Sequence, residues 1–330
     1  MQGKSRTDWR SLHGDFFSQN RVLITGGAGF IGSHLAEALC ALGAQVVAMD
    51  DLSGGAWENV ASFGPVERVQ ASILDRDVLG RAMQGCSFVF HQAALGSVPR
   101  SVEQPALYNE VNTHGTLNVL EAARATGVKR VMFAASSSAY GDNGVPWIET
   151  MPVLPKSPYA ATKAAGEALL RAYSASYGLD TAALRYFNIF GPRQNANSAY
   201  AAVIAAFAKA FLSNERPTIY GDGEQSRDFT FVHNAVHANL LAARREQPIA
   251  GEVINVGTSG RISVNVLSEM MAEALGAAQL RALHAPERAG DLKHSYADLT
   301  RARAMLKYEP IVSFKEGLAE TLAWYKSVMR

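Results

Sequence analysis

The stretch that most constrains the fold of this chain runs from Val22 to His34 and reads Val-Leu-Ile-Thr-Gly-Gly-Ala-Gly-Phe-Ile-Gly-Ser-His. Its first three residues are apolar, as in a parallel strand that is covered on both faces. Gly26 permits a tight turn, Gly29 lets the backbone approach a pyrophosphate, and Gly32 lets the next helix pack close to the strand. The N–H groups at the start of that helix favour a diphosphate. A strand, a glycine turn and a helix together predict a dinucleotide site.

A carboxylate stands at the end of a second apolar run, Gln45 to Met49. Asp50 follows Gly26 by 24 residues, close to the spacing expected for an acid that binds the adenosine ribose. A carboxylate there accepts hydrogen bonds from both ribose hydroxyls and repels a 2′-phosphate. We therefore expect NAD rather than NADP, and interpret the neighbouring Asp51 as part of an acidic turn.

Composition narrows the class of protein. The chain has 330 residues, of which 48% are hydrophobic, so it can form one large domain or two closely packed ones. Lys plus Arg is 31 and Asp plus Glu is 30, with no basic run, so no nucleic-acid partner is expected. Cys40 and Cys86 form neither a disulfide framework nor a metal-ligand cluster, and no metal is expected. Without a signal peptide or a bilayer-spanning stretch, the sequence indicates a soluble cytoplasmic protein with no membrane partner.

The order of apolar runs predicts an α/β fold. Residues 1–20 are expected to be an N-terminal extension with one short amphipathic helix. Strands are then expected at 21–25, 45–49, 66–70, 87–90, 129–135 and 181–186, and helices at about 30–42, 76–83, 105–126 and 157–177. This alternation is typical of a Rossmann-like, doubly wound parallel sheet.

After about residue 190 the regularity ends, which indicates a smaller C-terminal substrate-binding lobe. We expect residues 21–189 to form the NAD-binding domain, with 231–262 returning to it, and 190–230 with 263–330 to form the lobe. The helices at 105–126 and 157–177 carry small residues at helical spacing. A homodimer packed through these helices would explain them, and ordinary internal packing explains them almost as well.

Tyr159 and Lys163 lie four residues apart at the start of a predicted helix and therefore share one face. A phenol with a pKa of about 10 is a poor base at neutral pH, and a neighbouring ammonium lowers that pKa. The pair is a plausible acid/base unit, or else an amphipathic surface pair. Ser136, Ser137 and Ser138 follow an apolar strand, so their hydroxyls face the cleft at its carboxyl end. We favour them as donors to a substrate hydroxyl over three residues that begin a loop.

Six sequence runs together resemble the extended short-chain dehydrogenase/reductase superfamily, in its nucleotide-sugar epimerase/dehydratase branch. They cover about residues 20–300, in order, and are Thr25 to Gly32, His91 to Ala94, Ser136 to Gly141, Tyr159 with Lys163, Arg185 to Asn188, and Gly221 to Gly223 with Arg227 to Phe229. The resemblance implies the following catalytic residues: Tyr159 as base, Lys163 and Ser136. It implies NAD binding by Gly26, Gly29, Phe30, Ile31, Gly32, Asp50, Ser53, Ala93, Ala94, Tyr159 and Lys163. It implies substrate binding by Ser97, Ser136, Ser137, Ser138, Asn188, Ala202, Val203, Tyr220, Arg227, Arg288, Asp291 and Ser295.

Within the branch, the runs Ala94 to Ser101 and Gly191 to Asn195 are similar to those of bacterial UDP-N-acetylglucosamine 4-epimerases. Dehydratases of the branch carry an Asp-Glu pair where this chain has Ser137 and Ser138, and hydroxyls cannot do that acid/base work. Ser72 replaces the usual Asp that meets the adenine, which weakens one cofactor contact.

The resemblance implies an NAD-dependent UDP-hexose 4-epimerase that interconverts UDP-GlcNAc and UDP-GalNAc through a 4-keto intermediate. Alternatives are another UDP-sugar enzyme, namely a UDP-glucose or UDP-uronic acid 4-epimerase, a decarboxylase or a dehydratase, or a catalytically silent NAD-binding regulator.

One position bears on the sugar. In the family, a residue of the C-terminal lobe borders the C2 substituent, and a bulky Tyr there restricts enzymes to glucose and galactose. The resemblance places Ser295 at this position, which leaves room for an acetamido group. If the match slips by one residue, Tyr296 fills the space and the argument reverses.

Overall fold

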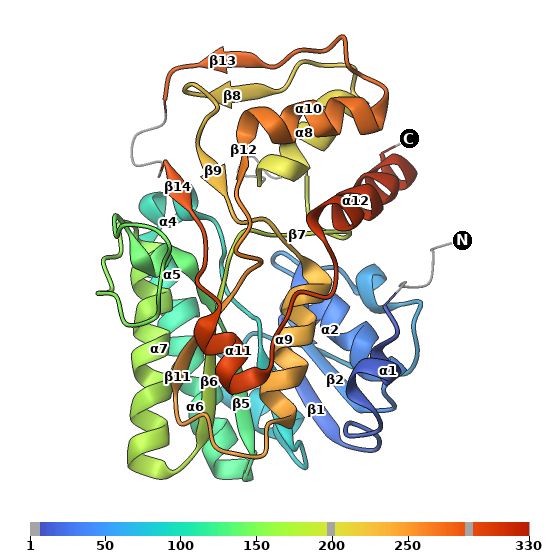
Figure 1. Cartoon of the computed structure of the whole chain (residues 1–330). Helices are drawn as coiled ribbons and strands as arrows, with labels where there is room; N and C mark the ends of the chain where they lie inside the picture. The colour runs from blue at the N-terminus through green and yellow to red at the C-terminus, as the bar shows by residue number, and fades with distance from the viewer. Residues whose placement is uncertain (1–6, 197–201, 288–292, 330) are drawn as a thin grey trace.

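The computed structural model describes residues 7–196, 202–287 and 293–329. At its centre is a seven-stranded parallel sheet with the order β11-β6-β5-β4-β1-β2-β3 (Figure 1). Its strands are β1 Arg21–Thr25, β2 Gln45–Asp50, β3 Val66–Gln70, β4 Phe88–His91, β5 Arg130–Ser136, β6 Asp180–Tyr186 and β11 Glu252–Val256. The chain winds outward from β1 to β3 and then from β4 to β11 on the other side. This order confirms the predicted doubly wound α/β fold.

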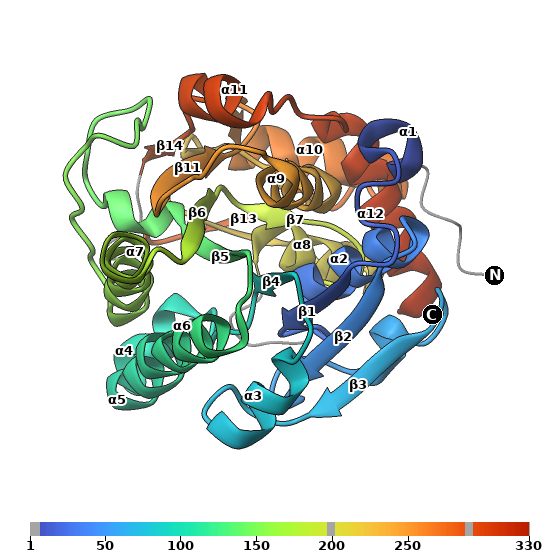
Figure 2. The same ribbon diagram turned by 90° about the horizontal axis from the view of Figure 1, so that it is seen from below.

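Helices cover both faces of this sheet (Figure 2). The face that carries α2 (Phe30–Ala41) also carries α9 (Val232–Arg244) and α11 (Thr300–Leu306). The opposite face carries α3 (Arg76–Met83), α6 (Gly115–Thr126) and α7 (Pro158–Tyr177). On β1, Val22 and Ile24 enter the first core and Leu23 enters the second, and all three are fully buried. Both faces of the strand need apolar side chains, which explains the unbroken apolar runs in the sequence.

The helix predicted over 105–126 consists of three joined segments: α5 (Pro105–Tyr108), a π-helical segment at Asn109–His114, and α6. The i→i+5 pattern inserts one residue into the turn and re-aims the side chains within it, and such insertions are frequent at functional sites. Here Asn112 is turned inward and is 2% exposed.

The smaller lobe lies above the sheet in Figure 1. Its apolar core is formed mainly by α8 (Val203–Leu212), α10 (Val264–Leu275) and α12 (Phe314–Val328). Its short strands are β7 Ile189–Phe190, β8 Thr218–Tyr220, β9 Ser226–Arg227, β10 Thr230–Phe231, β12 Ile262–Ser263, β13 Leu283–Ala285 and β14 His294–Ser295. The residue boundaries of the two parts stay a prediction; α11, from the second part, packs in the core of the sheet.

The N-terminal extension contains the expected short helix, α1 (Trp9–His13). Trp9 and Phe17 are buried in the core of the sheet, on the face that carries α2 and α9. The remaining short helices border the cleft described below or lie near it: η1 (Trp57–Val60), α4 (Val98–Glu103) and η3 (Ser137–Tyr140).

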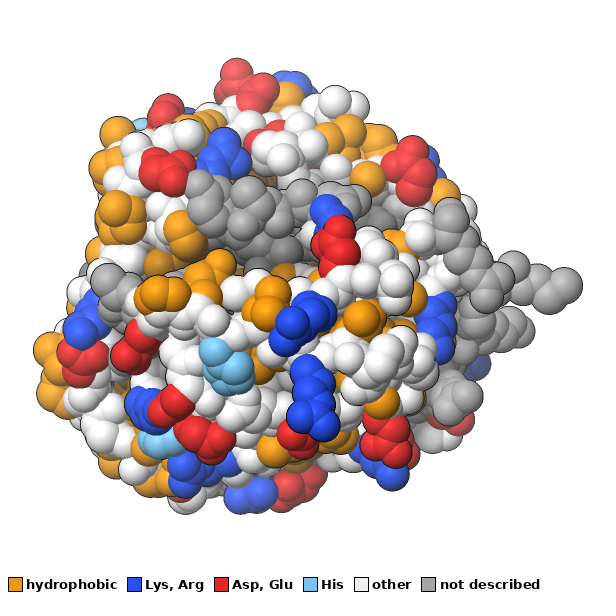
Figure 3. All heavy atoms as spheres, turned by 90° about the horizontal axis from the view of Figure 1, so that it is seen from above, with side chains coloured by type: hydrophobic (Ala, Val, Ile, Leu, Met, Phe, Trp, Pro, Cys, Tyr) orange, Lys and Arg blue, Asp and Glu red, His pale blue; other side chains and the backbone are white. Residues whose placement is uncertain are grey.

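Acidic and basic side chains alternate among hydrophobic ones over the face shown in Figure 3. In the part of the chain that the structure describes, no helix is both long and apolar enough to cross a membrane.

Candidate active site

An open cleft of about 1450 Å³ lies between the carboxyl ends of the central strands and the smaller lobe. Parallel sheets place their ligands at this edge because successive loops splay apart there. The cleft brings together most of the site residues that the sequence predicts. The predicted residues that line it are Gly26, Gly29, Phe30, Ile31, Gly32, Asp50, Ser53, Ala93, Ala94, Ser97, Ser136, Ser137, Ser138, Tyr159, Lys163, Asn188, Arg227 and Ser295.

In the glycine turn after β1, the positions of Gly26, Gly29 and Gly32 leave little room for a Cβ. Gly26 has φ +68°, and a Cβ added to it would lie 2.8 Å from the backbone nitrogen of Ala93. A Cβ on Gly32 would lie 2.0 Å from the carbonyl oxygen of Gly26, and one on Gly29 would lie 3.2 Å from the same oxygen. Glycine is therefore required where the turn meets the strand and where the helix packs against it.

Helix α2 begins at Phe30 without a side-chain cap: its N-cap residue is Gly29, and no acidic residue occupies its first turn. The N–H groups of such a first turn have no partner within the helix and carry a partial positive charge. They face the cleft through Phe30 and Ile31, which line it. This geometry fits the diphosphate of a dinucleotide.

Asp50, at the end of β2, is 8% exposed and lines the cleft. Its Oδ2 accepts a hydrogen bond from the Ala28 N–H at 3.0 Å, and its Oδ1 accepts one from the Leu52 N–H at 2.8 Å. Burial raises the pKa of this carboxyl, and the backbone donors oppose that rise. Each oxygen retains a lone pair for a ribose hydroxyl. Ser53, by contrast, donates through its backbone N–H and its hydroxyl to Asp51 Oδ1.

We expect the protein to bind NAD more tightly than NADP. A 2′-phosphate would be placed against the Asp50 carboxylate in a partly buried site, where repulsion between like charges is poorly screened. Isothermal titration of both dinucleotides checks the expectation, and Asp50→Asn should narrow the difference between the two affinities. Tighter binding of NADP by the parent protein would contradict the assignment of Asp50.

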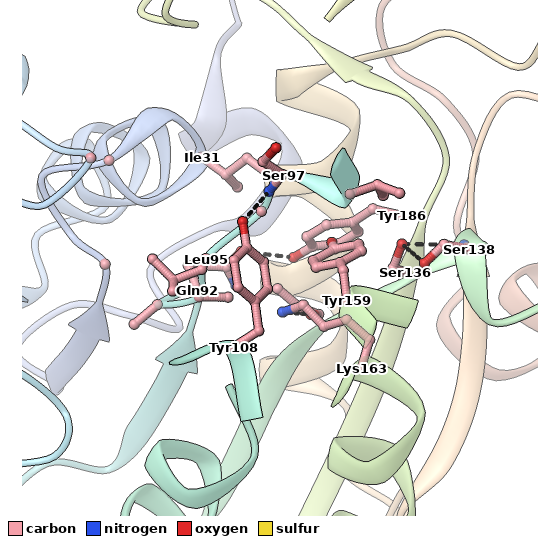
Figure 4. Close-up of a pocket in the computed structure, with 18 of the residues that line it drawn as sticks. Ile31, Gln92, Leu95, Ser97, Tyr108, Ser136, Ser138, Tyr159, Lys163 and Tyr186 are labelled. Carbon is pink, nitrogen blue, oxygen red and sulfur yellow. Dashed lines mark hydrogen bonds between the residues drawn. The ribbon is translucent and has the colours of Figure 1, made fainter. Parts of the chain in front are cut away.

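Helix α7 carries Tyr159 and Lys163, which enter the cleft from the same side as Ser136 and Ser138 (Figure 4). The helix starts at Pro158, and the Ser157 side chain caps it by accepting from the Ala160 N–H. Tyr159 is half-buried, whereas Lys163 is 4% exposed. Lys163 Nζ donates to the Ala134 carbonyl oxygen at 2.8 Å and lies 6.0 Å from the centre of the Tyr159 ring.

The charge states of this pair differ from the sequence-based expectation. Burial raises the pKa of Tyr159, and its hydrogen bond with Ser136 acts in the opposite direction. Burial lowers the pKa of Lys163 to about 7, and Glu167 opposes this shift. The Ser136 hydroxyl, and not the Lys163 ammonium, stabilises the phenolate form of Tyr159. Lys163 Nζ instead donates its hydrogen bond to the Ala134 carbonyl oxygen.

The serines after β5 form a compact donor group. Ser136 and Ser138 share a hydrogen bond between their hydroxyls at 2.8 Å, and Ser136 Oγ also accepts from the Ser138 N–H at 3.2 Å. Ser136 is the N-cap of η3, so its hydroxyl position is set by the backbone. These hydroxyls can donate to a substrate oxygen but cannot act as carboxylic acids.

The predicted substrate residues divide between the cleft and a neighbouring pocket. Asn188, with φ +38°, donates to the Asp228 carbonyl oxygen at 3.2 Å, and Arg227 Nη1 donates to the Ser226 carbonyl oxygen at 3.0 Å. Both also line a smaller pocket of about 310 Å³ together with Ala202, Val203 and Tyr220. Ser97 caps α4 by accepting from the Arg100 N–H at 3.2 Å. Arg288 and Asp291 lie outside the described residues.

Ser295 lies on β14, in register with Arg227 of β9, and is 5% exposed at the wall of the cleft. The neighbouring Tyr296 has its ring 5.0 Å from the Arg261 guanidinium. Tyr296 follows the last residue of β14, and of these two described residues it is Ser295 that lines the cleft.

Sequence reasoning missed Tyr108, which lines the cleft, and Asn112, which binds the cleft residue Leu95. Asn112, in the π-helical segment, binds the backbone of Leu95 through both its oxygen and its nitrogen, at 2.8 and 3.1 Å. Tyr108 accepts a hydrogen bond from the Ser97 N–H at 3.2 Å (Figure 4). The only sequence signal for either residue was a polar group inside an amphipathic helix.

A hydrogen-bonded network at the end of β6 was also missed. Asn239 of α9 donates to the Tyr186 hydroxyl at 2.6 Å, and that hydroxyl donates to Gln92 Oε1 at 3.2 Å. Burial raises the pKa of Tyr186 to about 12, so this phenol stays neutral. The network joins α9 to the carboxyl ends of β4 and β6, where Gln92 and Tyr186 line the cleft.

A family profile and a relative of known activity both match this chain. The sequence profile of the NAD dependent epimerase/dehydratase family matches residues 22–257. A UDP-glucose 4-epimerase of Mycolicibacterium smegmatis is 41% identical over 93% of this chain and 99% of that protein.

Two solved structures are similar to this chain over more than nine-tenths of its length. A UDP-N-acetylglucosamine 4-epimerase from Methanobrevibacter ruminantium, in complex with UDP-N-acetylmuramic acid, has a TM-score of 0.89 and 41% identity over 94% of this chain and 99% of that one. A Thermus thermophilus UDP-glucose 4-epimerase complex with NAD has a TM-score of 0.85 and 38% identity over 93% and 99%. The chain belongs to the NAD-dependent epimerase/dehydratase family of extended short-chain dehydrogenases/reductases.

Proposed function

We propose that this protein is an NAD-dependent UDP-hexose 4-epimerase whose substrates are UDP-GlcNAc and UDP-GalNAc. The observation that carries the proposal is the grouping of Tyr159, Lys163 and Ser136 at one wall of a cleft whose other end fits a dinucleotide. The M. ruminantium relative, named for UDP-N-acetylglucosamine, supports the N-acetyl sugar, and the UDP-glucose 4-epimerases support the reaction class.

In the proposed reaction, Tyr159 removes the proton from the sugar O4, and Ser136 donates a hydrogen bond to the same oxygen. NAD, when bound at this site, would supply the hydride acceptor for C4 and the hydride donor for the return step. Because the phenolate is costly in a buried site, the hydrogen bond from Ser136 is needed to favour it. The smaller lobe would hold the nucleotide through Asn188 and Arg227, so that the 4-keto sugar can turn without leaving.

The neighbours of Ser136 favour epimerisation over elimination. Ser137 and Ser138 carry hydroxyls, and the loss of water from a sugar needs a general acid and a general base at the positions they occupy. The keto intermediate is therefore expected to return to an alcohol.

A panel of UDP-sugars tests the proposal. Incubation with UDP-GlcNAc is expected to yield UDP-GalNAc, and the reverse, with no change of mass. UDP-glucose, UDP-galactose and the UDP-uronic acids are tested in parallel. A product of lower mass would indicate a dehydratase or a decarboxylase, and the absence of turnover with every UDP-sugar would favour an NAD-binding regulator.

Replacement of Ser295 by tyrosine is expected to exclude the N-acetyl sugars. The phenol would fill the space beside the sugar C2, so kcat/KM for UDP-GlcNAc and UDP-GalNAc should fall by at least about tenfold, while UDP-glucose and UDP-galactose are spared. Ser295→Ala, which keeps the space open, is the matched control. If the tyrosine variant handles both sugar pairs as the parent does, Ser295 does not border C2.

We also propose that the protein is a homodimer that packs through residues 105–126 and 157–177 and acts in the cytoplasm. The outer face of α7 presents exposed small side chains, among them Ala161, Ala168 and Ala172, which let two helices approach closely. The free thiols of Cys40 and Cys86 suit a reducing compartment. Light scattering after gel filtration measures the mass of the assembly.

A further inference from the structure

Two opposite charges are buried one layer below the cleft, Glu167 on α7 and Arg185 on β6. Arg185 Nε and Nη2 donate to the two carboxylate oxygens of Glu167 at 2.8 and 2.7 Å. The side chain of Arg185 is 2% exposed and that of Glu167 is 6% exposed. An ion pair this deep gains little net stability over apolar residues, because both charges lose their hydration. Its neighbours point to a role in the reaction.

On α7, Tyr159, Lys163 and Glu167 follow one another at intervals of four residues and form one line along the helix. Lys163 is therefore flanked by the proposed base on one side and by a buried carboxylate on the other. The Glu167 charge raises the pKa of Lys163, whereas burial, the larger effect, lowers it to about 7. The charge of Lys163 near neutral pH depends on this balance.

Arg185 links the same pair to the serine segment. It lies beside Ala135 in the register of β6 and β5, one residue before Ser136. Its guanidinium carbon is 4.4 Å from the centre of the Tyr140 ring, in the η3 turn that Ser136 caps. The ion pair therefore connects α7, with Tyr159 and Lys163, to the end of β5.

The other titratable groups around Lys163 are neutral or already paired. These groups are His91 on β4, Tyr159 on α7, and Tyr186 and Arg185 on β6. Burial lowers the pKa of His91 to about 3 and raises that of Tyr186 to about 12, so both are uncharged at neutral pH. Arg185 is compensated by Glu167 itself.

We propose that Glu167, held in place by Arg185, is a positioning residue: its carboxylate favours the protonated form of Lys163 next to Tyr159, and the pair holds α7 against the Ser136 segment. The expected effect of Glu167 on turnover rests on the proposed epimerase function. The expected effect of Glu167 on the titration of Lys163 does not depend on that function.

The first test measures the amine itself. Competitive acetylation with acetic anhydride, followed by mass spectrometry of the peptide that contains Lys163, gives its titration curve from mildly acidic to alkaline pH. In Glu167→Gln we expect this curve to move to lower pH by about one unit, because the opposite charge is lost while the side-chain shape is kept. Glu167→Asp keeps the charge and should keep the parent curve.

A matched control lies at the other end of the same two strands. Asp180 of β6 pairs with Arg130 of β5, and their side chains are 16% and 6% exposed. Asp180→Asn removes a carboxylate from a buried pair far from Lys163, so any loss of stability should leave the Lys163 curve unchanged. If Glu167→Gln does not fold, Glu167→Gln with Arg185→Met removes both charges. This double variant should move the Lys163 curve in the same direction by a smaller interval, because the positive charge of Arg185 is lost as well.

The second test follows kcat against pH with UDP-GlcNAc. In Glu167→Gln the alkaline limb should move down by the same interval, whereas a purely structural role would lower kcat equally at all pH values. An unchanged Lys163 titration in Glu167→Gln, or in the double variant if that is the one that folds, would overturn the inference. A shifted titration without turnover of any UDP-sugar by the parent would instead refute the proposed function alone.

Discussion

Tyr159→Phe is expected to lower kcat for the 4-epimerisation by about 10²–10⁴-fold, the range for a lost general base. The substitution keeps the ring in the cleft wall and removes the hydroxyl that binds Ser136. Since Tyr159 is half-buried and neither caps a helix nor pairs with a charge, the fold and the dinucleotide site should persist. The loss should therefore appear in kcat, with NAD still bound.

The matched control is Tyr177→Phe, at the far end of the same helix. Tyr177 is 56% exposed, and its ring contacts Tyr173 and the Arg124 guanidinium outside the cleft. Steady-state kinetics and NAD titration of both variants separate chemistry from binding. A Tyr159→Phe enzyme that turns over near the parent rate would remove Tyr159 from the mechanism.

The second large effect is acid sensitivity, because several histidines are buried together at the N-terminal extension. We call His13, His34, His233 and His237 the histidine cluster. His13 Nε2 lies 3.0 Å from His237 Nδ1, and the rings of His34 and His233 are 5.4 Å apart. The Thr7 hydroxyl lies 2.8 Å from His233 Nδ1. The cluster joins α1, α2 and α9.

Burial lowers the pKa of every member: to about 3 for His13 and His233, to about 4 for His237, and well below the ordinary 6.5 for His34. Above pH 6.5 these side chains are neutral in both the folded and the unfolded chain. Below it, the unfolded chain binds protons that the folded chain excludes. The free energy of unfolding therefore falls by up to about 1.4 kcal/mol per histidine for each pH unit, until the folded pKa is reached.

Against a total stability of about 5–15 kcal/mol, a loss from four such groups is large. We expect urea unfolding at about pH 5.5 to show a clearly lower midpoint than at about pH 7.5. His237→Gln should flatten this dependence, whereas His114→Gln, at an exposed position, should not. Equal midpoints at the two pH values would show that the cluster does not titrate on unfolding.

Sequence reasoning placed most of the central sheet because its signals are local. The strand at 21–25 is found at the same residues, and the predicted strand at 45–49 is one residue longer as β2. The helix at 105–126 was predicted without its π-helical segment. Asn112 in that segment makes hydrogen bonds with Leu95 and Thr162, and such tertiary contacts cannot be predicted from the spacing of residues along the helix.

The same division holds within the site. Short-range spacing is enough to place Tyr159 beside Lys163 on one helical face, and Gly26, Gly29 and Gly32 in one turn. The pKa of Tyr159 is different, because it depends on how deeply the fold buries the ring and on its contact with Ser136. The expectation that Lys163 lowers this pKa was drawn from their spacing and did not include the hydrogen bond from Lys163 Nζ to the Ala134 carbonyl oxygen.

By itself, the sequence determined the strand–turn–helix of the dinucleotide site and the alternation that builds a doubly wound sheet, and it predicted the candidate reactive side chains. These depend on periodicity and on spacings of a few residues. Only the tertiary structure decided which distant groups meet: Gln92 with Asn239 across 147 residues, His13 with His237 across 224, and Glu167 with Arg185 between a helix and a strand. Such contacts arise when segments that are far apart in the chain pack against the central sheet, and burial then sets the charge of each group.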